Sequence, residues 1–160
     1  MTELSRSGIT LDLPPGWGGE ISGDQAPVLG SEGTDPPPGV ERSNVAHLAN
    51  FVLPADRGTF GAGVVEFMDY GDVFMVLYEY ERAGAGAWLF AHHGAPGPVK
   101  VGDFDRNNLQ RLIPGQSGLQ LFFTEAGRAF CWYIVIGNHF DRVDALPTVN
   151  HVLRSLEIKP

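Results

Sequence analysis

The residue types that can carry out chemistry are few in this chain and lie far apart. His92 and His93 form its one pair of adjacent histidines. Adjacent side chains on a strand point to opposite faces, so this pair can share a metal ion only if it lies in a loop. A third ligand, such as His139, His47 or Asp103, would then have to come from elsewhere in the fold. Since the spacing matches no known zinc motif, we expect an exposed loop and no metal site here.

A glycine-rich segment, GTFGAG at residues 58–63, directly follows Arg57. A phosphate-binding loop opens a helix and, in the Walker form, carries a lysine followed by serine or threonine. The next segment, VVEF at 64–67, has instead the composition of a strand. We therefore interpret the glycines as a flexible connection between strands, and we expect no cofactor.

The single cysteine, Cys131, excludes an internal disulfide bond. It stands between Phe130 and Trp132 in an apolar run, whereas a reactive thiolate needs an accessible, electropositive environment. We expect a buried core residue. Ser117 and Ser155 lack the Gly-x-Ser-x-Gly context of a nucleophile elbow.

An enzyme remains the alternative, as a small-molecule pocket or a hydrolase-like site near His92 and His93. Arg57 and Glu79 are the other residues from which it would be built. All four would have to share one cleft, because hydrogen-bond reach is only about 3 Å. No catalytic constellation is visible in the spacing, so we favour a non-enzymatic role.

Length and composition predict the number of domains, the class of partner and the localisation of the protein. With 160 residues, of which 43% are hydrophobic, the chain is expected to form a single domain over residues 1–160. The formal net charge of -8 disfavours nucleic acid and anionic membranes, since both select a basic surface. The N-terminus lacks the apolar region of a signal peptide, and no apolar run reaches the length of a membrane span. These features predict a cytoplasmic protein.

The elements that would position these residues begin with a predicted hairpin. Two apolar runs, 119–124 and 129–136, flank Glu125-Ala126-Gly127, which we interpret as a three-residue turn. The second run carries no charge on either face, as in a strand covered on both sides. In the first run Gln120, Phe122 and Thr124 alternate with apolar residues and form a mixed face.

Further strands are predicted from short apolar runs bounded by turn residues. They lie at 8–13, 45–51, 64–67, 73–80, 109–113 and 156–158. Residues 22–43 are rich in Gly, Pro, Asp and Ser, and predict a long mobile loop within the domain. Apolar residues spaced three and four apart from Val143 to Leu156 predict an amphipathic helix. An N-cap at Asp144 would place Pro147 in the first turn, where its missing N–H costs nothing.

Together these elements predict an α+β fold. We expect a twisted antiparallel sheet of about six or seven strands, with the C-terminal helix packed on one face in a sandwich-like arrangement. Because two strands are apolar on both sides, the other face must also be covered. The long loops, the segment around Trp88 or a second subunit could cover it.

Two end motifs carry a family resemblance: LPPGW at residues 13–17, closing the first predicted strand, and VLRSLEI at 152–158. With this order of elements, the chain resembles the PsbP-like superfamily, which includes an extrinsic photosystem II protein and a Ran-binding import factor. FTEAGRAFC at 123–131 and LQRLIPGQ at 109–116 also resemble uncharacterised actinobacterial proteins. The resemblance implies a sheet between helical or loop layers, and a binding module, adaptor or chaperone without catalytic residues.

The leading hypothesis is therefore a cytoplasmic binding or adaptor domain that acts through protein–protein contacts, as a homodimer. Mixed aromatic faces are typical of partner surfaces. We assign the predicted surface to Gln120, Phe122, Thr124, Trp88 and Phe90. A chaperone for apolar segments of a secreted partner is a further alternative, and it would need an open apolar groove.

Overall fold

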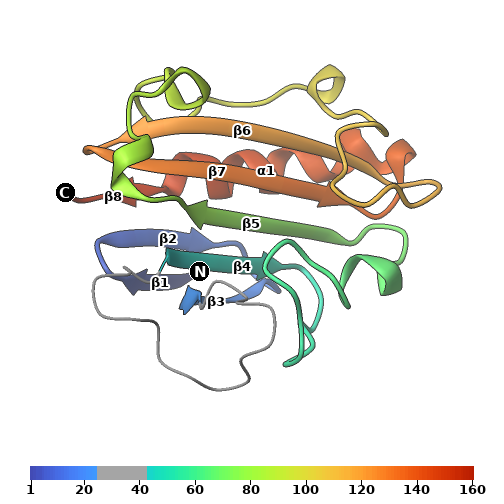
Figure 1. Cartoon of the computed structure of the whole chain (residues 1–160). Helices are drawn as coiled ribbons and strands as arrows, with labels where there is room; N and C mark the ends of the chain where they lie inside the picture. Colours follow the sequence, from blue (N-terminus) through green and yellow to red (C-terminus); the bar gives the residue numbers. More distant parts are fainter. Residues whose placement is uncertain (25–42) are drawn as a thin grey trace, which may run out of the picture.

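The computed structural model describes residues 1–24 and 43–160 and contains two antiparallel sheets (Figure 1). The strands are β1 (Thr2–Arg6), β2 (Ile9–Leu13), β3 (Gly18–Asp24), β4 (Ser43–Ala49), β5 (Val73–Glu79), β6 (Ser117–Glu125), β7 (Arg128–Ile136) and β8 (Glu157–Ile158). The large sheet has the order β3-β4-β5-β7-β6 and the small sheet the order β1-β2-β8. The α+β class is confirmed. Most of the loop expected at 22–43 lies outside the described residues.

One face of the large sheet is covered by helix α1 (Arg142–Ser155) and by the small sheet (Figure 1). The helix buries Val149, Val152 and Leu153 in the same core as Trp132 and Ile134 of β7. These helical residues follow the spacing of three and four that predicted the helix. The helix position on one face is therefore confirmed.

The expectation of a single sheet of six or seven strands was wrong. β1 and β2 form a hairpin across Ser7 and Gly8, both of which have positive φ, as a tight two-residue turn requires. β8 then joins β2, pairing Ile9 with Ile158. The small sheet packs beside α1 on the large sheet, which gives the fold its sandwich-like character.

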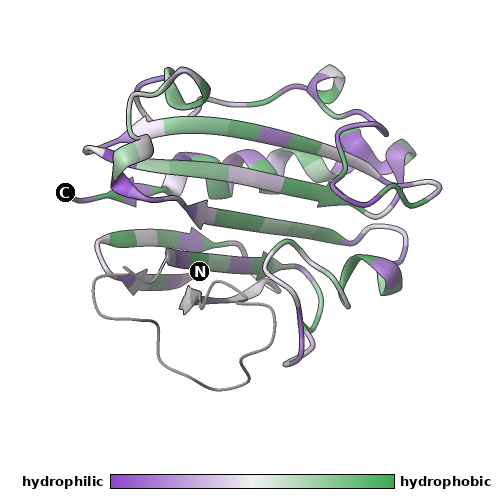
Figure 2. Cartoon of the chain, viewed as in Figure 1, coloured by the Kyte–Doolittle hydropathy of each residue, from purple (hydrophilic) through white to green (hydrophobic). Residues whose placement is uncertain are grey.

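β7 is an interior strand of the large sheet, as its apolar sequence predicted, but the central strand is β5 and not β7, as had been expected. All nine of its residues are buried, and it pairs with β5 on one side and β6 on the other. Figure 2 shows the central strands as hydrophobic along most of their length. The β6–β7 turn is shorter than expected: Glu125 pairs with Arg128, and Ala126 and Gly127 form a two-residue turn with positive φ.

The second face of the large sheet is covered by connections of this chain. Phe74 and Val135 pack there against Val64, Val65 and Leu109, which lie outside the strands. The segment expected as a strand at 64–67 is a 3-10 helix, η1 (Val65–Phe67), because the N–H groups of residues 64 and 65 turn back to the Gly61 carbonyl. The segment expected as a strand at 109–113 pairs with no strand within residues 1–24 and 43–160.

The helix begins earlier than expected. A 3-10 turn, η5 (His139–Asp141), runs directly into α1, so Asp141 is the N-cap and Pro147 lies inside the helix. The predicted N-cap at Asp144 was therefore wrong. Pro147 lacks the N–H that would reach the carbonyl of Val143, and Val143 lies on the exposed side of the helix.

Candidate binding surface

Four aromatic side chains, Tyr78, Tyr80, Phe90 and Phe122, gather on the second face of the large sheet. Together with Trp88, which lies on the same short helix as Phe90, we call them the aromatic surface. Tyr80 has its ring centroid 4.8 Å from that of Tyr78 and 5.1 Å from that of Phe90. Phe122 lies 5.8 Å from Phe90, in an edge-to-face arrangement. Such tilted pairs stabilise the cluster beyond the area they bury. Tyr78, Tyr80 and Phe122 remain partly exposed.

The sheet register explains why these rings meet. Tyr78 on β5 and Phe122 on β6 are both paired with Cys131 on the strand between them. The three side chains therefore stand in one row on one face. Burial raises the pKa of Cys131 to about 12, so the thiol is a neutral part of the floor. Burial, with Cys131 and Tyr78 nearby, also raises the pKa of Tyr80 to about 12, and its hydroxyl stays uncharged.

A short 3-10 helix, η3 (Trp88–Phe90), brings two of these rings to the sheet. The hydroxyl of Thr124 donates to the Phe90 carbonyl over 2.7 Å and accepts from the N–H of Gly86 over 3.0 Å. Thr124 is itself buried, so it fastens η3 and is covered by it. Trp88 extends away from this attachment and is 87% exposed.

Of the predicted binding residues, the structure thus joins Phe90, Phe122 and Thr124. Gln120 lies on the same face of β6, further along, where its amide donates to the Asn108 carbonyl at 3.4 Å. Trp88 is on η3 beside the cluster. Sequence reasoning missed Tyr78 and Tyr80 as members, although their alternating positions at the end of a predicted strand were a usable signal.

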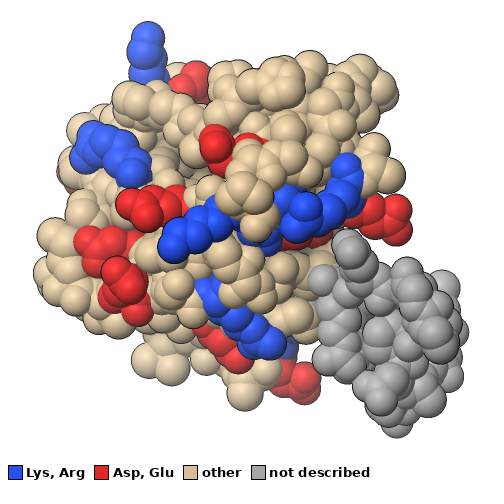
Figure 3. All heavy atoms as spheres, turned by 90° about the vertical axis from the view of Figure 1, so that its left-hand side faces the viewer, with Lys and Arg blue, Asp and Glu red and all other residues tan. Residues whose placement is uncertain are grey.

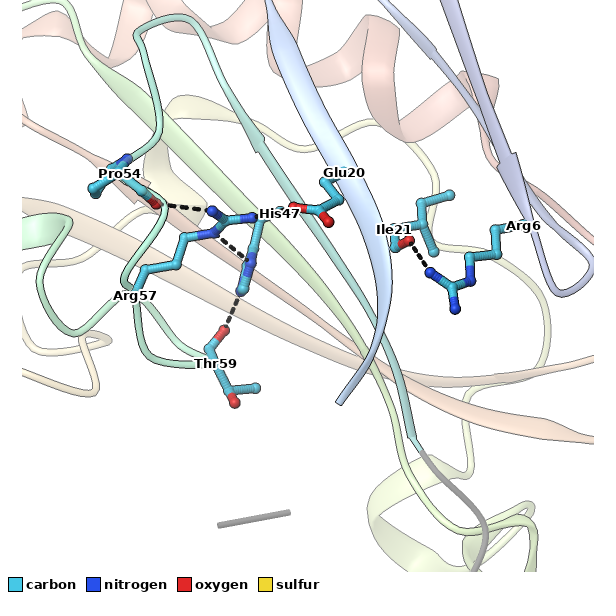
Figure 4. A network of polar contacts seen from close by, with 7 residues as sticks. All are labelled: Arg6, Glu20, Ile21, His47, Pro54, Arg57 and Thr59. Atoms are coloured by element: carbon cyan, nitrogen blue, oxygen red, sulfur yellow. Dashed lines mark hydrogen bonds and ion pairs between the residues drawn. The ribbon is translucent and has the colours of Figure 1, made fainter. Parts of the chain in front are cut away.

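The residues of the alternative enzymatic site are held in separate networks. Arg57 donates to His47 Nδ1, to the Pro54 carbonyl and to Glu20, over 2.8 to 2.9 Å (Figure 4). Since Nδ1 is the acceptor, His47 Nε2 carries the proton and donates to the Thr59 carbonyl at 2.7 Å. This network fastens the glycine-rich connection to β3 and β4.

Glu79 belongs to a different cluster, at the opposite end of β5 from η1. It forms an ion pair with Arg128, whose Nη1 donates to the Lys159 carbonyl at 2.8 Å. Glu125 is the register partner of Arg128 across the β6–β7 turn, but its carboxylate accepts the N–H of Ala95. The side chains of Arg128 and Glu79 are only 3% and 12% exposed, so this ion pair is largely shielded from solvent.

His92 and His93 lie in an exposed segment after η3, which crosses the β6 edge. The His92 carbonyl accepts from Thr124 N–H, and His93 forms a parallel bridge with Thr124. Within residues 1–24 and 43–160, no three His, Cys, Asp or Glu side chains lie close enough to hold a metal ion. The histidines therefore serve the strand edge through their backbone.

A second exposed apolar region, which was not predicted, lies at the other end of the large sheet. Tyr70 in a tight turn and Phe140 in η5 are 83% and 79% exposed. Both stand in short polar contexts, DYGD and NHFD, where a large ring is unusual.

Within the described residues, no helix is long and apolar enough to cross a bilayer.

The charged side chains on the side that faces the viewer in Figure 3 are of both signs, without a continuous basic or acidic area. Such a surface has no strong preference for polyanions.

The PsbP-like resemblance stays a prediction that rests on its two end motifs. Comparisons with protein-family models, with curated proteins and with solved structures found no match to this chain.

Proposed function

We propose that the chain is a non-enzymatic binding domain that acts through protein–protein contacts, and that the aromatic surface is where it does so. The observation that carries this proposal is Trp88, a large ring held almost fully in solvent by a short helix that is itself fastened to the sheet. Tryptophan and tyrosine dominate the binding energy of protein interfaces. A rigid attachment lowers the entropy lost when such a ring is buried by a partner.

The surroundings of Trp88 support the same proposal. Tyr80 and Phe122 lie partly exposed beside Phe90, so a partner that covers Trp88 also meets an apolar floor. Tyr80 stays neutral well above physiological pH, because burial raises its pKa to about 12. A partner therefore buries this ring without desolvating a charge.

The occupant we propose is a second copy of the same chain. A twofold axis would bring the aromatic surface against itself, and residues on one protomer would meet their counterparts on the other. The side of the molecule drawn in Figure 3 carries charges of both signs, which do not oppose association of two copies as a surface of one sign would. The cytoplasmic binding role expected from the sequence is retained in this proposal.

Light scattering after size-exclusion chromatography tests the proposal with two matched variants. Trp88→Glu adds a charge to the aromatic surface, and Val52→Glu adds the same charge at a 94% exposed apolar residue after β4. We expect wild type and Val52→Glu to be dimers at micromolar concentration, and Trp88→Glu to be a monomer with an unchanged circular dichroism spectrum. A monomeric wild type, or a dimeric Trp88→Glu protein, would contradict the proposal.

A further inference from the structure

A cavity of about 400 Å³ opens at the end of the large sheet where β5 begins and β7 ends. Its walls come from three segments, residues 66–70, 113–116 and 137–140. Met68, Ile113 and Pro114 give it an apolar part. Its charged lining residues are Glu66 and Asp69, with no lysine or arginine among them.

Two exposed aromatic rings, Tyr70 and Phe140, also line this cavity. The turn that carries Tyr70 is held by several hydrogen bonds: Asp69 N–H donates to the Asp72 carboxylate, and Gly71 N–H donates to the Asp141 carboxylate, each over 2.8 Å. These bonds fix the backbone of the turn, and so the point from which the exposed ring projects. A fixed attachment lowers the entropy lost when a ligand binds.

Phe140 is held in a similar way from the other side of the cavity. Its N–H donates to the side chain of Asn138 at 3.3 Å, within η5. The guanidinium of Arg106 lies over the Phe140 ring, 5.6 Å from its centroid. This ring therefore already takes part in a cation–π contact within the protein.

The two acidic residues differ in what they can offer a ligand. Glu66 accepts from the N–H of Gly63 over 2.8 Å and forms an ion pair with Arg111. The carboxylate of Asp69, in contrast, makes no hydrogen bond or ion pair with any described residue. Gln116, on the same wall, has a buried Oε1 with no hydrogen-bond donor among those residues, which adds to the negative potential.

From this combination we infer that the cavity binds a cationic nitrogen on an apolar stem, an alkylammonium or alkylguanidinium group. Asp69 supplies the counter-charge and the ring of Tyr70 supplies a cation–π contact, while Phe140, over whose ring Arg106 already lies, adds apolar wall. The apolar wall at Met68 and Ile113 receives the stem. The side chain of a lysine or arginine in a peptide carries this chemistry, and so does a free amine.

Chemical shifts of backbone amides, followed by NMR during titration, test the inference. The probes are n-butylammonium and n-butylguanidinium, with n-butanol and butyrate as neutral and anionic counterparts. We expect saturable shifts at residues 69–71, 115–116 and 138–140 with the two cations, and at least tenfold weaker binding of the alcohol and the carboxylate. Equal binding of alcohol and ammonium, or shifts elsewhere, would overturn the inference.

Variants of the lining residues sharpen this test. Asp69→Asn keeps the backbone bonds of the turn, and should weaken cation binding about tenfold, the equivalent of about 1.4 kcal/mol. Tyr70→Leu should also weaken it, while Tyr70→Phe should not. Glu157→Gln, which removes an exposed carboxylate on β8, is the matched control and should leave affinity unchanged. An unchanged affinity in Asp69→Asn would overturn the inference.

Two further probes distinguish the sources of the cation. Lysine and arginine blocked at both ends as acetyl amides present the side chain as a peptide does. Binding of these at the affinity of the butyl compounds identifies a basic peptide side chain, whereas their exclusion identifies a free amine. Since Trp88 is remote from this cavity, Trp88→Glu should bind the probes as wild type does, which separates this test from that of the dimer.

Discussion

Replacing Arg128 by methionine should destabilise the protein more than any other single loss of charge described here. Arg128 is only 3% exposed, and its partner Glu79 is 12% exposed. Without the guanidinium, the Glu79 carboxylate keeps one long hydrogen bond among the described residues, from the amide of Asn44 at 3.4 Å. Breaking a buried ion pair from one side costs about 3–5 kcal/mol, because the remaining charge stays buried. The variant also loses the hydrogen bond from Arg128 to the Lys159 carbonyl. That bond joins the residue after β8 to the start of β7, beside the β6–β7 turn.

Urea denaturation followed by circular dichroism measures how much the Arg128→Met substitution lowers the free energy of unfolding. At about 2–4 °C per kcal/mol for a chain of this length, the expected loss also lowers Tm by about 6–20 °C. Arg111→Met is the matched control, since Arg111 pairs with Glu66 while being 65% exposed. Exposed pairs contribute about 0–1 kcal/mol, so this control should change little.

The double variant Glu79→Leu with Arg128→Met tests whether the unpaired carboxylate causes the loss of stability. Removing both charges together leaves no uncompensated carboxylate, and we expect it to be more stable than Arg128→Met alone. If Arg128→Met costs no more than Arg111→Met, or if the double variant is the least stable of all, the reasoning about this buried pair is refuted.

Three further outcomes follow from single residues. Cys131, whose pKa burial raises to about 12, should react with a thiol reagent only after unfolding, and fast labelling of the folded protein would contradict its place in the core. Partial burial and nearby guanidinium groups lower the pKa of His139 below 6.5, so the unfolded state takes up its proton first. The free energy of unfolding should therefore fall as pH drops below about 6.5, and His139→Gln should reduce that fall in urea titrations at several pH values. Gly137→Ala should cost about 1–3 kcal/mol, because its Cβ would overlap the Asp69 carbonyl, whereas Gly102→Ala, with open space around it, should be nearly neutral by the same assay.

Local periodicity was sufficient for the parts of the fold that are buried. The uncharged run of β7 and the apolar spacing of α1 each identify an element without knowledge of its neighbours. The reason is that the buried face of an element must be apolar, and this requirement leaves a periodic pattern in the sequence. β1 and β3 were missed. Both are outermost strands, TELSR and GGEISGD, whose exposed positions do not require alternating apolar residues.

Short-range hydrogen bonds that apolar periodicity does not report account for the other differences. The stretch 64–67 has the composition of a strand, but hydrogen bonds to Gly61 turn it into η1, and its valines cover the second face of the sheet. The helix start moved because η5 precedes it directly.

The residues of the candidate site also fall into two groups: those that a local pattern identifies, and those that depend on contacts between distant segments. Phe122 was identified from the mixed face of its own strand, and the structure places it against Phe90. The role of Thr124 depends on a bond to a segment 34 residues away, which no local pattern encodes. The cavity beside Tyr70 and Phe140 is assembled from three separate segments, so its residues could not be recognised before the fold was known.

Hydrogen exchange measured as a function of protein concentration tests the central claim most directly. If the aromatic surface joins two copies, raising the concentration from about 1 to about 100 μM should slow exchange at the amides of residues 86–90 and 120–122, where η3 and the middle of β6 lie. Residues 66–72 and 138–143, at the other end of the sheet, should exchange at the same rate throughout. Protection confined to that other end, or no protection anywhere, would contradict the account.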